Sequence, residues 1–199
     1  WLRNDPMENL VPSWTEPVDL GEDWPLRVVD LPELSCRLAL PEEWEQASEP
    51  DRNHLTIEAT FRGEMASELE AISYMPQADL SGDIRNWVEG IISVTGFPIP
   101  AMIKDTTPSL MEWAYEGKWP ALAERLGVDE CHTYQGLAYL PDSESEVARL
   151  YILLARRGRQ AWKIVLSFLS ACLPGTPEDE VYSNDHVRAA ATFGTLELH

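Results

Sequence analysis

The stretch RLYILLARRGRQAWKIVLSF, residues 149–168, determines the fold, because it is the most apolar segment of the chain and carries a turn in its middle. Arg156, Arg157 and Arg159 surround Gly158, so the apolar run ends well before the roughly 20 residues that a membrane-spanning helix needs. The short glycine-containing interruption predicts two antiparallel strands joined by a tight hairpin. We therefore expect part of a β-sheet here, and no membrane span.

The second strand of this hairpin is apolar on both faces. Trp162, Phe168 and the alternate positions between them share one face, whereas Val165 and Leu169 lie on the other. Central strands that are covered on both sides have this pattern. We expect helices to cover one face; the second is covered by residues 97–133, by the N-terminal arm, by a partner protein, or by another copy in a symmetric dimer.

Working outward, period-two alternation predicts further strands, and 3.6-residue spacing predicts helices. The expected strands cover residues 35–41, 55–62, 70–75, 133–140, 148–156 and 160–170, and the last three form an antiparallel meander. The expected helices cover residues 79–96, 119–127 and 176–194. In the last helix, we expect Val187, Ala190 and Ala191 on the buried side and Gly194 at the end.

Two segments break this regularity. Residues 1–33 contain five prolines and three tryptophans, which predicts an extended arm because proline fixes φ and disfavours helix. The arm docks on a partner or packs on its own domain, and we favour the second interpretation. Residues 97–133 are the least regular part of the remaining domain, residues 34–198, and we expect a bulky, irregular insertion that leaves the sheet. A strand at LMEWAYEG, residues 110–117, is one interpretation within it.

Charge and composition exclude several classes of function. The chain has 199 residues, with 34 acidic and 15 basic side chains and a net charge of −19. Such an acidic chain repels phosphate backbones, so nucleic acid is not an expected partner. The chain starts at Trp1 without an initiator methionine or an apolar signal core, which is typical of a trimmed chain. The compartment stays open, and we favour the cytoplasm over the periplasm or envelope.

No motif in the sequence predicts catalysis, a metal or a cofactor. Cys36, Cys131 and Cys172 lack metal-binding spacing, and we expect buried thiols; a disulfide between two of them in an oxidising compartment is the alternative. The four histidines are dispersed, so we expect no metal site. A hydrolase that uses Cys131 or a serine with His132 is the least favoured function, because adjacency in sequence does not make a catalytic pair.

The order strand, strand, strand, helix, insertion, three-strand meander, helix resembles the PsbP-like superfamily. The similarity rests on LALPEEWE at residues 38–45, on the helix around Trp87, on the hairpin at residues 151–168, and on FGTLEL at residues 193–198. The superfamily includes extrinsic photosystem II proteins, DcrB-like bacterial lipoproteins and type VI secretion effector chaperones. The resemblance implies an α+β fold, with an antiparallel sheet flanked by helices, and a non-enzymatic binding module.

We therefore expect a bacterial adaptor or chaperone that binds a protein partner or an apolar segment. The expected partner-binding residues are Val165 and Leu169 on the sheet face, together with Trp113 and Trp119. The alternative function is a small-molecule or lipid binder of the cell envelope, in which the same apolar surface lines a pocket.

Overall fold

The structure, a computed structural model, describes residues 20–47, 49–52, 56–63, 67–74, 110–118, 120–139, 147–170 and 179–199. The helix expected at residues 79–96 and most of the arm lie outside these ranges. In the described part, every strand pair is antiparallel, so the predicted α+β class is confirmed. No helix in the described ranges is long and apolar enough to cross a bilayer.

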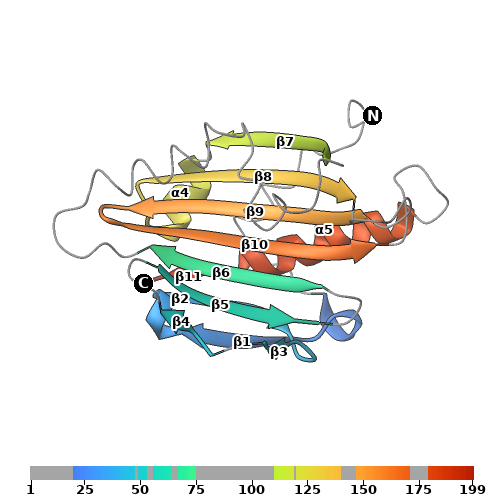
Figure 1. Ribbon diagram of the computed structural model, residues 1–199, viewed down its shortest axis with the longest axis horizontal. Helices are drawn as coiled ribbons and strands as arrows, with labels where there is room; N and C mark the ends of the chain where they lie inside the picture. The colour runs from blue at the N-terminus through green and yellow to red at the C-terminus, as the bar shows by residue number, and fades with distance from the viewer. Residues whose placement is uncertain are drawn as a thin grey trace.

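The strands form a large sheet and a small one (Figure 1). The large sheet has the order β3-β5-β6-β10-β9-β8-β7, with β4 beside β5. Its strands are β3 (Glu45–Gln46), β4 (Asp51–Arg52), β5 (Thr56–Arg62), β6 (Glu68–Tyr74), β7 (Leu110–Lys118), β8 (Glu130–Tyr139), β9 (Val147–Arg157) and β10 (Gln160–Ser170). The small sheet has the order β1-β2-β11. Its strands are β1 (Leu26–Leu31), β2 (Cys36–Pro41) and β11 (Glu197–Leu198).

Within the described ranges, four helical segments accompany the sheets: η3 (Gly21–Asp23), η4 (Pro32–Leu34), α4 (Pro120–Leu126) and α5 (Asp179–Gly194). The helix α4 lies against β8, whereas α5 lies against β10 and β2. In Figure 1 both helices lie behind the large sheet, on the same side. The last helix, α5, ends at Gly194, as predicted from the sequence.

The predicted hairpin and meander are present. Gln160 pairs with Arg157, and the register continues to Ser170 opposite Val147. Gly158 has a φ of 56°, a left-handed conformation that costs glycine little and suits the first position of a tight two-residue turn. On the other side, β9 pairs with β8 along its length, which completes the antiparallel meander.

The core lies between one face of the large sheet and a layer made of the small sheet, α4 and α5. Trp162, Ile164, Leu166 and Phe168 of β10 belong to this core, as predicted for that face. The ring of Phe168 contacts three further aromatic rings, with centroid separations of 6.0 to 6.5 Å. These rings belong to Trp24, Trp44 and Tyr151.

The opposite face of the hairpin is also buried. Ile152, Leu154 and Val165 expose 0%, 1% and 3% of their surface in a single copy of the chain. Burial within one copy means that neither a second copy nor a partner is needed to cover these three side chains. The two-sided apolar pattern therefore marks an interior strand, as expected from its periodicity.

Two boundaries differ from the sequence-based expectation. The segment 97–133, expected to leave the sheet, contributes β7, which pairs with β8 and extends the sheet by one strand. The strand considered at residues 110–117 and the helix expected at 119–127 are both present, as β7 and α4. Residues 26–31, expected in the arm, form β1 and pair with β2. The proline content was misleading here, because Pro25 and Pro32 flank β1 and remove no donor from its ladder.

The buried face of α5 also differs from the prediction. Ala190 and Ala191 are buried, but Val187 exposes 41% of its surface. Asp185 is buried instead, because it accepts a hydrogen bond of 3.1 Å from the equally buried Arg149 guanidinium of β9. Burial raises the pKa of Asp185, whereas Arg149 lowers it. A paired charge therefore takes a position that a periodicity search assigns to an apolar residue.

We expect Asp185→Asn to lower the free energy of unfolding by about 3 to 5 kcal/mol, because it removes the carboxylate that balances the buried Arg149 charge. Replacing both residues by apolar ones, as in Arg149→Met with Asp185→Leu, should recover much of this loss. Urea denaturation of the three proteins measures both effects. A double variant no more stable than Asp185→Asn would show that the pair itself is not the source of the penalty.

A second stability test concerns Gly63, which lies directly against the indole of Trp44, where a Cβ atom would collide with the ring. We expect Gly63→Ala to destabilise the protein by about 1 to 3 kcal/mol through overpacking. Thermal unfolding of Gly63→Ala alone and together with Trp44→Phe measures the coupling. An unchanged penalty in the Trp44→Phe background would contradict the steric explanation.

Candidate functional site

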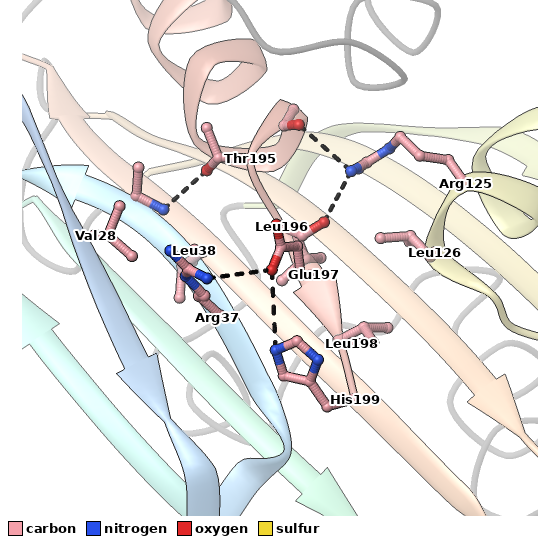
Figure 2. A pocket seen from close by; sticks show the side chains of 12 residues that line it. Val28, Arg37, Leu38, Arg125, Leu126, Thr195, Leu196, Glu197, Leu198 and His199 are labelled. Atoms are coloured by element: carbon pink, nitrogen blue, oxygen red, sulfur yellow. Dashed lines mark hydrogen bonds and ion pairs between the residues drawn. The ribbon is translucent and has the colours of Figure 1, made fainter.

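A groove of about 620 Å³ opens where the small sheet meets α4 and the end of α5 (Figure 2). It draws its residues from four parts of the fold: β1, β2, α4 and the C-terminal segment. The lining residues are Val28, Arg37, Leu38, Ala39, Arg125, Leu126, Gly194, Thr195, Leu196, Glu197, Leu198 and His199. Segments far apart in the sequence thus form one concave surface.

The C-terminal wall of the groove is held by β11 and the residues that flank it. Glu197 pairs with Arg37 of β2, and the His199 amide donates to the Ser35 carbonyl at 2.8 Å. Before the strand begins, the Thr195 hydroxyl accepts a hydrogen bond of 2.8 Å from the Ala39 amide (Figure 2). This side chain therefore continues the pairing along β2 where β11 has no backbone partner to offer.

Arg125 of α4 forms the opposite wall and ties it to the end of α5. Its guanidinium donates to the carbonyls of Phe193 and Leu196 at 2.8 Å and to that of Gly194 at 3.3 Å. The last carbonyls of a helix lack partners within the helix, and a cation there also complements the helix dipole. Burial lowers the pKa of Arg125, yet a guanidinium stays charged at neutral pH. Arg125 thus holds the groove in a fixed shape.

The rim of the groove carries exposed charges. The Glu197 carboxylate lies 3.8 Å from the Arg37 guanidinium and 3.9 Å from the His199 imidazole. All three side chains are about half exposed, so these ion pairs contribute little stability and can exchange for contacts with a ligand. Val28 stands beside them on β1 with 59% of its surface exposed. The groove therefore combines an apolar wall with adaptable polar groups.

The residues predicted for partner binding lie elsewhere. Val165 is buried in the large sheet, opposite Ile152 and Glu70. Leu169 and Trp113 belong to β10 and β7, where only their backbone is described, and Trp119 lies outside the described residues. None of the four is among the described residues that line the groove. A binding role for them stays a prediction. Val165 is buried, so the residues that cover it would have to move before it could contact a partner.

The sequence analysis missed Val28, Arg37 and Thr195 as site residues. The sequence did contain one indication of a strand here: Val28 and Val29, two β-branched residues, lie with Leu31 between Pro25 and Pro32. Because residues 1–33 were assigned to the arm, this strand was not predicted. Thr195 carried no signal, since its bond to Ala39 joins residues 156 positions apart.

The two thiols that the structure describes are buried. Cys36 and Cys131 are both free and buried, as predicted, and Cys172 lies outside the described residues. Burial raises the pKa of each thiol to about 12, with Asp30 adding to the effect at Cys36. His132 follows Cys131 in β8, so the two side chains point to opposite faces of the sheet. Among the described residues, no group of three or more His, Cys, Asp or Glu could hold a metal.

A charged cluster lies on the second face of the large sheet. The Lys163 ammonium is 3.2 Å from the Glu70 carboxylate, and both side chains are largely buried. Glu58 lies on the neighbouring strand β5, and its pKa is raised by burial and by the negative charge of Glu70, against a lowering by Lys163. Glu58 and Glu70 thus share one lysine. Lys163 forms its ion pair with Glu70, so the charged form of Glu58 is less well stabilised.

No protein-family model and no curated protein matches this chain. Nineteen chains of solved structures match, among them the following two. A crystal structure from Bacteroides thetaiotaomicron VPI-5482 aligns with 87% of this chain at 12% identity and a TM-score of 0.41, and the chain spans 48% of that protein. The solution structure of cyanobacterial PsbP (CyanoP) from Synechocystis sp. PCC 6803 aligns with 92% of this chain and 96% of its own length, at 10% identity and a TM-score of 0.48.

With identities of 10% and 12% and TM-scores below 0.5, neither likeness assigns a family to this chain, and the resemblance to the PsbP-like superfamily stays a prediction. The more specific relations expected from the sequence, to DcrB-like lipoproteins and to type VI secretion effector chaperones, stay predictions. No statement about function rests on either structure.

We expect Arg125→Ala to lower the free energy of unfolding by roughly 2 to 3 kcal/mol, because three carbonyls lose a charged donor. Arg125→Lys should lose less, since one ammonium can still reach part of the carbonyl cluster. In Arg125→Ala, the amide hydrogen-exchange rates of β11 should increase more than those of the other strands. Equal stability of wild type and Arg125→Ala would contradict this role.

Glu58 generates a prediction on pH. Because its folded pKa is raised, the folded state binds the proton more tightly than the unfolded state. Its contribution to stability is therefore greatest below the ordinary glutamate pKa of about 4.3 and is lost as the pH rises through the raised value. Glu58→Gln should raise the melting temperature at pH 7 and lose this advantage below about pH 4. Glu43→Gln, at an exposed position, is the control, and an equal gain there would contradict the assignment.

Proposed function

We propose that this chain is a non-enzymatic binding module, an adaptor or chaperone, whose groove takes a segment of a protein partner. The observation that carries the proposal is the groove itself, with a lining that mixes apolar and polar side chains, the exposed Val28 and a polar rim formed by Arg37 and Glu197. Binding sites in proteins are typically concave and mostly apolar, with a few placed polar groups that orient the ligand.

The rigidity of the groove supports this proposal. Arg125 bonds to three carbonyls on one side, and Thr195 bonds to β2 on the other. A preformed site loses less conformational entropy when it binds, so more of the contact energy appears as affinity. An adaptor needs a stable recognition surface of this kind.

The state of the described side chains favours binding over catalysis. A thiol with a pKa of about 12 is protonated at neutral pH, and the thiolate is the reactive form of cysteine. His132, on the opposite face of the sheet from Cys131, is not positioned to remove that proton. The hydrolase considered from the sequence therefore gains no support from the described part of the chain.

The volume of the groove favours a second candidate function. Pockets for small ligands usually measure about 300 to 1,000 Å³, and 620 Å³ falls in this range. A small-molecule or lipid binder would use the same apolar lining, with Arg125 and Arg37 near a polar head group. The protein-binding function is preferred because Val28, which lines the groove, still exposes 59% of its surface and so offers an apolar contact to an extended segment.

We expect Val28→Asp to weaken binding of a groove-directed peptide roughly tenfold or more, because it places a charge in an apolar contact. The probes are peptides selected from a randomised twelve-residue phage library against the full chain, with affinity measured by fluorescence anisotropy. Val187→Asp is a matched control, since Val187 is likewise an exposed valine but lies on α5.

Peptides that bind Val28→Asp as tightly as wild type would show that the groove is not the site. If selection enriches no peptide, the protein-binding function is wrong. The small-ligand function is then tested by titrating a fatty acid and a phospholipid head group, with amide shifts at Leu38, Ala39 and Leu196 as the readout.

A further inference from the structure

The strand β1 lies at an end of the small sheet, whose order is β1-β2-β11. In Figure 1 it runs along the lower margin of the molecule. An end strand presents one row of backbone amides and carbonyls that its own sheet does not use. The question is which residues of β1 supply that row.

The hydrogen bonds along β2 show which residues of β1 face away from the sheet. The Ala39 amide bonds to Thr195 and the Ser35 carbonyl accepts from His199, so these positions of β2 face β11. In an antiparallel strand, the direction of the backbone groups alternates from residue to residue. Leu38 therefore faces β1, where it pairs with Val29. The neighbours of Val29, which are Val28 and Asp30, point their amides and carbonyls away from the sheet.

Within the described ranges, the outward-facing backbone groups of Val28 and Asp30 have no hydrogen-bond partner. Both side chains are exposed, and that of Val28 also lines the groove. A strand placed beside β1 would thus meet a free hydrogen-bonding edge and an apolar side chain at the same position. Peptide recognition by strand addition uses this combination, with the backbone supplying affinity and alternate side chains supplying specificity.

The charge around β1 indicates what kind of strand fits. Residues 21–46 contain seven acidic and two basic residues. The acidic residues, all exposed, are Glu22, Asp23, Asp30, Glu33, Glu42, Glu43 and Glu45. The basic residues are Arg27, which donates to the Trp44 carbonyl at 2.7 Å, and Arg37, which pairs with Glu197 outside this segment, so seven negative charges against two positive ones leave an excess of five. Both ends of the strand are therefore flanked by uncompensated negative charge.

A second copy of this chain does not suit the edge. Pairing β1 with β1 of another copy would bring two acidic margins together, in molecules that each carry a net charge of −19. Like charges across an interface disfavour association, whereas opposite charges speed encounter and fix register.

We propose that the partner segment adds to β1 as an extra strand, and that it is an extended peptide carrying lysine or arginine. The proposal rests on the proposed function and names the class of partner. The backbone of the segment bonds to Val28 and Asp30, its apolar side chains contact Val28 beside the groove, and its cationic side chains meet the surrounding carboxylates, among them Glu33.

The test uses the full chain and three synthetic peptides. The first is acetyl-(Lys-Val)₄-amide, the second has glutamate in place of lysine, and the third is the fully N-methylated form of the first, which keeps the charges but has no backbone donors. Affinity is measured by calorimetry at two salt concentrations. NMR hydrogen exchange of the Val28 and Asp30 amides reports whether the edge is used.

We expect the lysine peptide to bind, to slow exchange at both amides, and to weaken with added salt. The glutamate and N-methylated peptides should bind roughly tenfold or more weakly. Asp30→Asn with Glu33→Gln should also weaken binding of the lysine peptide, whereas Glu124→Gln, at an exposed position of α4, should not.

Equal binding of the N-methylated peptide, or unchanged exchange at Val28 and Asp30, would overturn strand addition and leave only general electrostatic attraction. The outcome is separable from the proposed function. Library peptides that lose affinity with Val28→Asp, yet carry no excess of lysine or arginine and leave both amides unprotected, would support the groove and reject the cationic strand.

Discussion

The hairpin of β9 and β10 is apolar on both faces, and the rest of the structure depends on covering it. One face carries the aromatic and aliphatic residues around Trp162 and Phe168, which the small sheet, α4 and α5 bury. The other face carries Ile152, Leu154 and Val165, which are buried within the same copy. Hydrophobic burial of this extent is the dominant favourable term in folding, so the other elements are arranged around this strand pair.

A few arginines attach the covering layer to the hairpin. Arg149 of β9 reaches Asp185 within α5, and Arg125 of α4 binds carbonyls at the C-terminal end of the same helix. Arg157, at the hairpin turn, donates to the last carbonyls of the chain and stacks on Trp162. Arg125 and Arg157 donate to carbonyls that follow a helix end and a strand end, whereas Arg149 pairs with a buried carboxylate.

The groove is a consequence of this arrangement. Because α5 ends at Gly194 and the chain returns at once as β11, the turn between them stands above β2 and faces α4. Arg125 ties α4 to the residues after α5, and Thr195 ties the same segment to β2, so the two walls keep a fixed separation. The side chain of Val28 remains outside the core, since β1 lies at the end of the small sheet and has no further strand beside it among the described residues.

The sequence by itself determined the elements whose signal is local. Period-two alternation indicated β2, β5, β6 and the meander, and glycine at residue 158 indicated the hairpin turn. Only the tertiary structure decided where buried charges and long-range pairs lie. Asp185 replaced Val187 on the buried face of α5 because Arg149, 36 residues away, neutralises it. The groove likewise joins residues 28 and 199, and no local pattern records contacts between segments that meet only when the core has formed.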